Sequence, residues 1–342
     1  LLFIFLMVQV IITIKNIRIT NMEKNKRFGL KIGVVLLAAV AVAVALWAMW
    51  PEEEEREISQ SNERAYRHVE VDGRQFDYNT NLLTLLCMGI DTTDESVAQS
   101  DVIDLMVLDR EEERIKILSI SRDAMVPIRI FDAGGKSLGW EEQHLALASS
   151  YGSTQERGCL LTCEAVSKML WDIPIVYYVG ANLSAFDQFQ SLAGDFDIVV
   201  PDDSLASLGA EYQKGSTLTI TEENAELFVR SRDTDVDFSN TSRMLRQQAY
   251  IEGYINTLRE QLQEDFNGTV ARASSLLPQL VTNISVDEVT DFAEMLMNYE
   301  FSADEDYIVV EGTQEKGLFH DEYYIDESKL QELILEVFYK AQ

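Results

Sequence analysis

Residues 82–123, LLTLLCMGIDTTDESVAQSDVIDLMVLDREEERIKILSISRD, decide the fold of this chain. Leu82–Ile90 is a near-continuous apolar run, typical of a strand that is buried on both faces. Residues 102–109 and 114–120 are two further apolar runs joined by a short polar segment, and this pattern predicts a hairpin. Strands and helical segments alternate through the rest of the chain. We therefore expect an α/β fold with a mixed central sheet covered by helices on both faces.

The hairpin also predicts a register. If its turn is centred between Glu111 and Glu112, position 101 lies opposite position 122, so Asp101 and Arg122 meet at the open end. If Leu82–Ile90 runs parallel to 114–120, Asp91 reaches the same end. Ligand sites in α/β folds usually form at such an edge. The alternative for each aspartate alone is a turn residue that ends a strand.

The remaining elements follow from periodicity and capping signals. Thr221 is expected to cap a helix that runs to about residue 228. Further helices are expected at 141 to about 172, 183–193, 240 or 241 to about 262, 286–298 and 327–339, and further strands at 174–180, 196–200 and 307–310.

Residues 32–50, IGVVLLAAVAVAVALWAMW, form an uncharged run of nineteen residues that nearly spans a bilayer. Lysine and arginine precede it and glutamate follows it, which predicts a cytoplasmic N-terminus. The alternative, a cleaved signal peptide, is disfavoured because the run is long and lacks a small-residue cleavage site. We expect a non-native upstream extension at 1–21, a cytoplasmic basic segment at 22–31, a single-pass anchor in the cell membrane at 32–50, a juxtamembrane stalk at 51–80 and an extracellular domain at 81–342.

The charge of the chain excludes one class of partner. The net charge is −30, and residues 1–50 hold six of the 28 basic residues and one of the 58 acidic residues. Residues 51–342 therefore carry 22 basic and 57 acidic residues, a net charge of −35. Such a surface repels phosphate backbones, so we expect no nucleic-acid partner.

The three cysteines do not predict a disulfide framework. Cys87 lies in an apolar run and is expected to be a core thiol. Cys159 and Cys163 have no nearby histidine, which disfavours zinc, and a disulfide between them is sterically awkward within a helix.

Arginines gather in residues 228–248, FVRSRDTDVDFSNTSRMLRQQ. Arg230 and Arg232 are two apart, which places them on one face of an extended segment. Arg243, Arg246 and Gln247 are three and four apart, which places them on one face of a helix near its start. Guanidinium groups suit phosphate oxygens, so two such pairs predict an anion site. The alternative is pairing of these arginines with the aspartates at 233, 235 and 237.

Five segments in order resemble the LytR-CpsA-Psr (LCP) family: LLTLLCMGID, SDVIDLMVLD, ILSISRDAMV, DIPIVYYVGANLSAFDQF and FVRSRDTDVDFSNTSRMLRQQ. The likeness covers roughly residues 80–342. It implies an enzyme on the outer face of the membrane that transfers a glycopolymer, of the teichoic acid or capsular polysaccharide type, from a polyprenyl-pyrophosphate carrier to peptidoglycan. The chain departs from the family at Ser121, where many members have proline, and near His144, where many have lysine.

The resemblance also implies roles for individual residues. Asp91 and Asp101 match an acidic pair that organises Mg²⁺ on the pyrophosphate. Arg122 and Asp123 match an arginine–aspartate pair after the hairpin, and Arg230, Arg232, Arg243 and Gln247 match further members of the site. With Arg246, which the helical spacing adds, the expected set is catalytic Asp91, Asp101, Arg122 and Asp123, and pyrophosphate-binding Arg122, Arg230, Arg232, Arg243, Arg246 and Gln247.

Three functions are consistent with these residues. The first is the glycopolymer transferase, in which Asp91 or Asp101 accepts a proton from the attacking hydroxyl. The second is a pyrophosphatase that acts on polyprenyl-pyrophosphate lipids with water. The third is a non-catalytic protein of cell-wall assembly or regulation that binds an anionic polymer or lipid.

Overall fold

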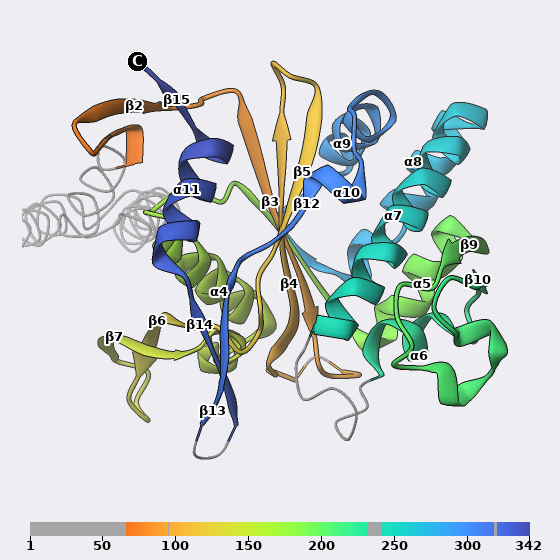
Figure 1. Ribbon diagram of the computed structural model, residues 1–342, viewed down its shortest axis with the longest axis horizontal. Coiled ribbons are helices and arrows are strands. Elements are labelled where there is room, and N and C mark those ends of the chain that lie inside the picture. The colour runs from red at the N-terminus through yellow and green to blue at the C-terminus, as the bar shows by residue number, and fades with distance from the viewer. Residues whose placement is uncertain (1–65, 95, 232–240, 318–319) are drawn as a thin grey trace, which may run out of the picture. The chain divides into compact units, whose positions relative to one another are not determined.

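The computed structural model describes residues 66–94, 96–231, 241–317 and 320–342 (Figure 1). Its centre is a six-stranded sheet in the order β11-β8-β3-β4-β5-β12. Strands β8 and β3 are parallel, as are β5 and β12, and the other neighbours are antiparallel. The predicted mixed sheet is therefore confirmed. Its strands are β3 (Leu82–Ile90), β4 (Ser100–Asp109), β5 (Arg114–Ser119), β8 (Tyr177–Asn182), β11 (Val281–Thr282) and β12 (Tyr307–Val309).

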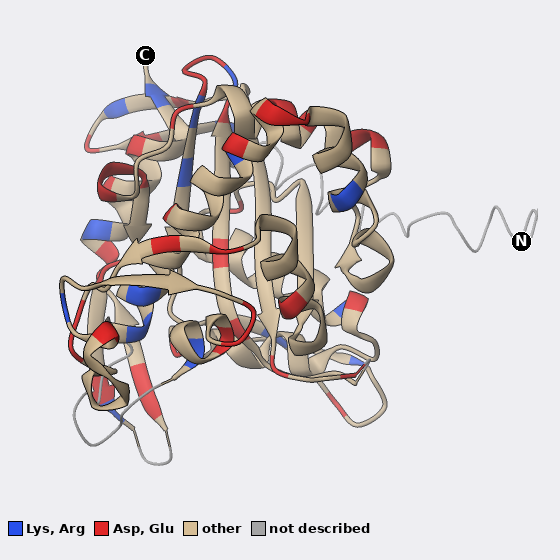
Figure 2. Cartoon of the chain, turned by 90° about the vertical axis from the view of Figure 1, so that its right-hand side faces the viewer, with Lys and Arg blue, Asp and Glu red and all other residues tan. Residues whose placement is uncertain are grey.

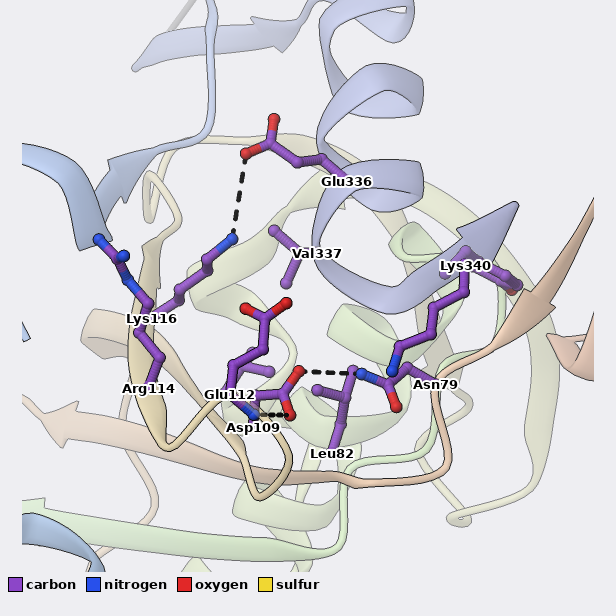
Figure 3. A pocket seen from close by; sticks show the side chains of 11 residues that line it. Asn79, Leu82, Asp109, Glu112, Arg114, Lys116, Glu336, Val337 and Lys340 are labelled. Carbon is purple, nitrogen blue, oxygen red and sulfur yellow. Dashed lines mark hydrogen bonds and ion pairs between the residues drawn. The ribbon is translucent and has the colours of Figure 1, made fainter. Parts of the chain in front are cut away.

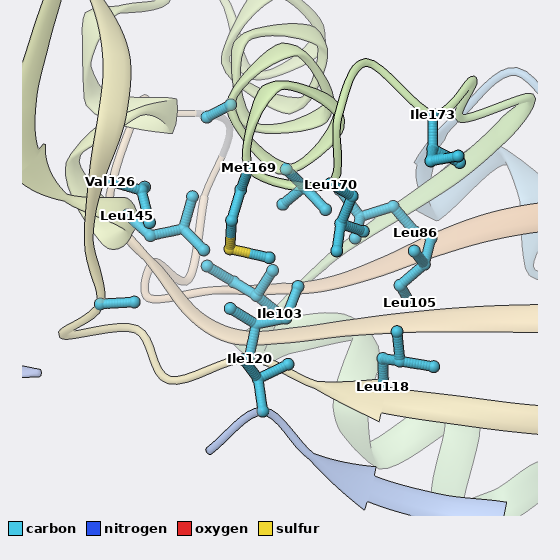
Figure 4. Packing of buried hydrophobic residues seen from close by; sticks show 14 of the residues in the cluster. Leu86, Ile103, Leu105, Leu118, Ile120, Val126, Leu145, Met169, Leu170 and Ile173 are labelled. Carbon is cyan, nitrogen blue, oxygen red and sulfur yellow. The ribbon is translucent and has the colours of Figure 1, made fainter. Parts of the chain in front are cut away.

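Helices cover both faces of this sheet, as predicted. Ile103, Leu105 and Val107 of β4 pack in the cluster that includes α4 (Gln155–Met169) and α11 (Glu327–Phe338) (Figure 4). Met106 and Leu108 point to the other face, with α7, α9 and α10. Alternate side chains of one strand thus enter two cores, which explains why the strand reads as continuously apolar. The second group of helices is α7 (Thr241–Glu264), α9 (Val286–Asn298) and α10 (Ala303–Asp306).

The β4–β5 hairpin has the predicted register. Asp104 lies opposite Ser119 and Asp109 lies opposite Arg114, so the same alignment carries position 101 opposite position 122. Because β4 is antiparallel to both neighbours, β3 and β5 run in the same direction. The end of β3, the start of β4 and the end of β5 therefore share one edge of the sheet.

A β-bulge lies at this edge. Gly89 pairs with Val102 but Ile90 pairs with Ser100, so Asp101 has no partner on β3. A bulge bends the strand and changes the direction of the extra residue's side chain. The strands also approach closely there, since a Cβ on Gly89 would lie 3.2 Å from Cβ of Val102. The bulge therefore sets how Asp101 is presented.

A second core lies beside the sheet. Strands β9 (Phe196–Val199) and β10 (Thr217–Ile220) form their own hairpin, packed against α5 (Leu183–Ala193), α6 (Ala225–Arg230) and α7. The predicted helix at 183–193 is confirmed. The predicted strand at 196–200 exists, but it lies outside the central sheet. Helix α6 begins at Ala225 rather than directly after Thr221, whose backbone oxygen accepts hydrogen bonds from the amides of Asn224 and Ala225. Helix α8 (Phe266–Ser274) follows α7.

The expected helix from 141 to about 172 is wrong in its first half. Residues 125–144 instead form a hairpin of β6 (Met125–Phe131) and β7 (Ser137–His144), followed by short 3₁₀ turns at Leu145–Leu147 and Ser149–Tyr151. The helix, α4, starts only at Gln155, where Thr154 accepts a hydrogen bond from the amide of Arg157 at 3.1 Å. The polar run 149–154, SSYGST, therefore ends one structure and caps the next.

The predicted stalk at 51–80 is also too long. Strands β1 (His68–Val71) and β2 (Arg74–Tyr78) form a hairpin, and β2 pairs with β15 (Tyr339–Ala341) at the C-terminus. The folded domain therefore already includes residues 68–78. The C-terminal part adds one more hairpin that the sequence did not predict, β13 (Gly312–Lys316) with β14 (Asp321–Ile325).

The expected segments 1–21, 22–31 and 32–50 lie outside the described residues. Among the residues that the structure describes, no helix combines the length and apolar character needed to cross a membrane. Figure 2 shows where the Asp and Glu positions and the Lys and Arg positions lie along the ribbon of the described domain.

One polar row crosses the buried sheet face toward α7. Cys87, Asp104 and Ser119 lie directly opposite one another on β3, β4 and β5. Asp104 is 6% exposed, and burial raises the pKa of its carboxyl to about 6, while a hydrogen bond with Ser119 opposes that shift. Burial also raises the pKa of the Cys87 thiol to about 12, so this cysteine is an unreactive core thiol. All three cysteines are free.

Replacement of Asp104 by asparagine should change how stability depends on pH. The folded-state pKa exceeds the ordinary value of 3.8, so the folded protein favours the neutral carboxyl. Ionisation then lowers the stability of the wild type as pH rises from about 4 to above 6, by at most about 3 kcal/mol. We expect this component to vanish in Asp104→Asn. Urea denaturation of both proteins between pH 4 and 8 measures the difference, and parallel profiles would contradict the prediction.

Candidate functional site

The site is built where β3, β4 and β5 end at one edge of the sheet. Asp91 follows β3, and its backbone amide donates to the carbonyl of Gln99 at 2.9 Å. Gln99 directly precedes β4, whose second residue is the bulged Asp101. Arg122 and Asp123 follow β5. Four of the predicted site residues therefore come together through strand pairing alone.

Arg122 is held on three sides. Its Nη1 donates to Asp101 Oδ1, its Nη2 donates to Gln99 Oε1 at 2.7 Å, and its Nε lies 3.4 Å from Asp123 Oδ1. Its backbone oxygen accepts a hydrogen bond from the amide of Ala146 at 3.0 Å. A planar guanidinium fixed in this way loses little conformational entropy when an anion binds to it.

Helix α6 brings a second arginine to the same edge. Arg230 is its last residue, and Nη2 donates to Asp91 Oδ1 at 3.1 Å while Nη1 pairs with Glu226 one turn earlier. Both side chains of the Arg230–Asp91 pair are partly open to solvent. This ion pair links the second core to the central sheet and keeps a guanidinium at the surface.

The electrostatics of Asp101 show that further groups converge. Burial raises the pKa of its carboxyl most strongly, the positive charge of Arg122 lowers it, and the negative charge of Asp91 raises it. The charges of Arg243 and Arg230 lower it further, but the net shift is upward. Asp91, Arg122, Arg230 and Arg243 thus all act on one carboxyl, although they come from four different segments of the chain.

Asp123 serves both the site and the fold. Its carboxylate pairs with Arg122, and its backbone oxygen accepts a hydrogen bond from the amide of Tyr323 in β14 at 2.9 Å. The β13–β14 hairpin is therefore hydrogen-bonded to the segment that carries Arg122 and Asp123. His144 contacts this hairpin too, with Nε2 at 3.1 Å from the backbone oxygen of Asp321.

Arg246 does not lie at the surface where we expected it. Its side chain is 1% exposed, and its Nε donates to the carbonyl of Phe228 at 2.8 Å. Its other nitrogens donate to the Ser204 hydroxyl and the Ser231 carbonyl. Arg246 thus fastens the end of α6 to α7 and positions Arg230 instead of facing an anion. The helical spacing predicted correctly that Arg246 shares a face of the helix with Arg243, but it did not predict that the Arg246 side chain is buried.

Two other expected ligands have different outcomes. Gln247 is half-buried, and its Nε2 donates to the carbonyl of Val229 at 3.3 Å, so it also touches the end of α6. Arg232 lies outside the described residues. The expectation that it joins Arg230 in the site stays a prediction.

The loop between β3 and β4 is tied to the helices around it. Asp94 Oδ1 accepts from the Thr92 hydroxyl at 3.0 Å and from the amide of Ser96 at 2.7 Å. Gln155, at the start of α4, donates to the carbonyls of Asp94 and Ser96 at 2.8 and 2.9 Å. The backbone amide of Leu183, at the start of α5, donates to the carbonyl of Thr92 at 2.9 Å. These contacts hold Asp91 and Gln99 in place.

Sequence reasoning missed Gln99 and Glu226. Gln99 carries no charge and lies in a loop, so no periodicity identifies it. Glu226 lies four residues before Arg230, and this i, i+4 spacing on a short helix was a usable signal for their pairing.

The donor set fits Mg²⁺ only together with a phosphate ligand. In the described part of the chain, no group of three or more His, Cys, Asp and Glu side chains is arranged to hold a metal ion. Asp91 and Asp101 are two carboxylates at the same edge, and the negative charge of Asp91 raises the pKa of the Asp101 carboxyl. Mg²⁺ commonly takes one or two carboxylates and completes its shell with substrate phosphates and water.

A cavity of about 80 Å³ at the opposite end of the hairpin is not a candidate site (Figure 3). Its cations have partners within the protein: Arg114 pairs with Asp306 and Glu305, both at 2.6 Å, and Lys116 lies 3.9 Å from Glu336. Asp109, at the far end of β4 from Asp101, also lines it. Its balanced charges stabilise the turn and leave no net field for an anion.

Comparison with known proteins agrees with this geometry. A model of the LytR_cpsA_psr family matches residues 51–335.

The chain belongs to the LytR_cpsA_psr family.

Two curated relatives are teichoic acid transferases by name. TagT of Bacillus subtilis, a polyisoprenyl-teichoic acid–peptidoglycan teichoic acid transferase, is 29% identical over 183 residues, which cover 50% of this chain and 52% of TagT. TagU of Halalkalibacterium halodurans, with the same descriptive name, is 23% identical over 304 residues, or 85% of this chain and 90% of TagU. The match to TagT thus spans about half of that protein's length.

Solved structures of the LytR_cpsA_psr family share this fold. TagT bound to LI-WTA aligns with a TM-score of 0.56 and 26% identity, and covers 80% of this chain and 96% of the other. TagV of B. subtilis aligns with the same TM-score at 21% identity, over 76% of this chain and 96% of its own. The predicted family and the mixed α/β architecture are both confirmed.

Substitution by methionine should mainly reduce stability at Arg246 and mainly reduce anion binding at Arg230. Arg246→Met leaves two carbonyls and a hydroxyl without their buried donor, so we expect a loss of about 3 kcal/mol in unfolding free energy. Arg230→Met removes an exposed ion pair and should change stability by less than about 1 kcal/mol.

In calorimetry with inorganic pyrophosphate, Arg230→Met should weaken binding roughly tenfold or more. Thermal and chemical denaturation of both variants measures the stability. If Arg246→Met is as stable as the wild type and loses pyrophosphate binding alone, Arg246 is a ligand after all.

Proposed function

We propose that this protein transfers a phosphate-linked glycopolymer, of the teichoic acid or capsular polysaccharide type, from a polyprenyl-pyrophosphate carrier to peptidoglycan. The observation that carries the proposal is the Arg122–Asp101 pair at the sheet edge, with Asp91, Arg230 and Arg243 acting on the same carboxyl. The names of TagT and TagU support the class of donor and acceptor.

The donor diphosphate needs its charge neutralised before the lipid phosphate leaves. Arg122 is preorganised by Asp101, Gln99 and Asp123, so it binds phosphate oxygens without reorientation. Arg230 can exchange part of its contact with Asp91 for a phosphate oxygen, because this pair is partly exposed. Residues 51–342 carry a net charge of −35, and at this edge the guanidinium groups of Arg122, Arg230 and Arg243 offer a diphosphate its charge-assisted hydrogen-bond donors.

The reaction exchanges one phosphorus–oxygen bond for another. A hydroxyl oxygen of the acceptor sugar forms a bond to the phosphorus that carries the glycopolymer, and the bond from this phosphorus to the bridging oxygen breaks. The lipid monophosphate leaves with the bridging oxygen, and a phosphodiester remains on the acceptor. The hydroxyl proton needs a base. Asp101 and Asp91 are two carboxylates at this edge that can accept it.

The same proposal includes Mg²⁺. Asp91 and Asp101 would hold it together with the two phosphates, and the ion would supply further neutralisation of the leaving phosphate. Asp91 is the more accessible ligand of the two, since 47% of its side chain is exposed.

The location is part of the proposal as well. A single-pass anchor at 32–50 with a cytoplasmic N-terminus would keep the domain on the outer face of the cell membrane, beside the polyprenyl carrier and the wall. A net charge of −35 disfavours a nucleic-acid partner.

The direct test incubates the protein with a polyprenyl-pyrophosphate-linked oligosaccharide and peptidoglycan strands, and detects a new phosphodiester by mass spectrometry. Asp101→Asn and Arg122→Ala should each lower the rate by about 100-fold or more. Lys116→Met, at the opposite end of β5, is the matched control and should keep the wild-type rate. Removal of Mg²⁺ with a chelator should stop transfer, and its return should restore it.

Two outcomes would contradict the transferase. Release of lipid phosphate at the same rate without any acceptor indicates a pyrophosphatase. Binding of the donor with no bond cleavage in the presence of Mg²⁺ and acceptor indicates a non-catalytic protein.

A further inference from the structure

The β6–β7 hairpin extends directly from the site. Arg122 and Asp123 lie in the short segment that precedes β6, and β7 returns to Leu145, whose amide donates to the carbonyl of Ala124 at 2.8 Å. The hairpin lies beside α4 and β14 (Figure 1). At about 3.3 Å per residue, its middle lies about 20 Å along the chain from Asp123. A chain-like acceptor that reaches the site can therefore also reach the hairpin.

The two faces of this hairpin differ in chemistry. Val126 and Ile128 are buried and belong to the main core. Arg129 alternates with them onto the opposite face, and the register places it directly opposite Trp140. The side chain of Trp140 remains 41% exposed, although tryptophan normally contributes to cores.

The ring of Trp140 has a defined neighbour. The guanidinium carbon of Arg129 lies 4.9 Å from the ring centroid. Arg129 Nε in turn donates to Glu164 Oε2 at 2.8 Å, and Glu164 Oε1 lies 3.5 Å from Arg157 Nη1. This chain of contacts anchors the Arg129–Trp140 pair to α4. An exposed ring that is held in this way needs little further ordering when a ligand binds.

The aromatic surface continues beyond Trp140. Phe131 lies two residues after Arg129 on the same strand face, and its ring centroid is 6.4 Å from that of Tyr151. Tyr151 is 37% exposed. Rings with charged groups beside them match a sugar chain, because sugar C–H groups pack on the negative face of an aromatic ring while the hydroxyls need polar partners.

We infer that the face of β6–β7 that carries Arg129 and Trp140 binds the glycan strand of the acceptor peptidoglycan. The inference rests on the proposed function, which requires such an acceptor. A membrane surface fits less well, because Glu141 and Glu142 are exposed beside Trp140 and anionic headgroups would repel them. The exposed rings of this face lie beside charged groups such as Arg129 and Glu142, unlike the continuous apolar patch of a protein interface.

The test measures cosedimentation of the full protein with insoluble peptidoglycan that has been stripped of teichoic acid. We expect Trp140→Ala to weaken binding roughly tenfold. Trp140→Tyr keeps an aromatic face and should retain most of the binding. The matched control is Leu138→Ala, on the same strand, because Leu138 is apolar and 61% exposed but lacks an aromatic ring. Circular dichroism and pyrophosphate calorimetry should be unchanged in all three variants.

The outcomes separate this inference from the proposed function. Wild-type binding by Trp140→Ala, or an equal loss in Leu138→Ala, overturns the inference and leaves the site at Asp101 untouched. If Trp140→Ala does not fold, soluble β-1,4-linked N-acetylhexosamine oligomers are added to the cosedimentation assay as competitors of peptidoglycan. Equal release of Trp140→Tyr and of the wild type from peptidoglycan supports the inference. No effect of the oligomers on either protein overturns the inference. Binding that depends on Trp140 in a protein that transfers nothing supports the inference while the proposed function fails.

Discussion

The ion pair between Arg122 and Asp101 is the contact on which the site depends. It joins the bulged start of β4 to the segment after β5, and it needs both the hairpin register and the extra residue at the bulge. Without the bulge, Asp101 would follow the ordinary alternation of β4 side chains between the two cores. One bulged residue thus places a functional carboxylate at the end of a strand whose other side chains form the core.

The rest of the site is arranged around this pair by contacts that are themselves structural. Gln99 holds Arg122 through its side chain and Asp91 through its backbone. Arg246, buried beneath the end of α6, keeps Arg230 at the rim. The exposed arginine is available to an anion because the buried one is fully engaged in holding the helix end. Such a division keeps one guanidinium accessible at the sheet edge while the other holds the helix end.

Sequence reasoning was most successful where one physical constraint dominates. Leu82–Ile90 was predicted with its observed bounds, because burial on both faces leaves little room for polar residues. The register of the hairpin followed from the turn between Glu111 and Glu112, and so did the meeting of Asp101 with Arg122. Helix α9 was equally well predicted, and Ser285 and Glu288 at its start form a capping box.

The predictions were wrong where local helix preference competes with strand pairing, or where the burial of a side chain decides its role. Residues 141–148 have a helical composition, but residues 141–144 pair with β6, and only a 3₁₀ turn follows at Leu145–Leu147. The spacing of Arg243 and Arg246 indicates a shared helix face, yet only the packing of Phe228 and Ser204 against that face determines which guanidinium is buried. The bulge at Asp101 has no sequence signature, since its cause is a register shift between strands that are distant in the chain.

The most direct test of the account is a crystal structure of the protein with a polyprenyl pyrophosphate and Mg²⁺. We predict that the diphosphate oxygens lie within hydrogen-bond distance of the guanidinium groups of Arg122 and Arg230, with the metal ion between the phosphates and the carboxylates of Asp91 and Asp101. A diphosphate bound away from this edge of the sheet, with the Arg122–Asp101 pair undisturbed and remote from it, would contradict the account.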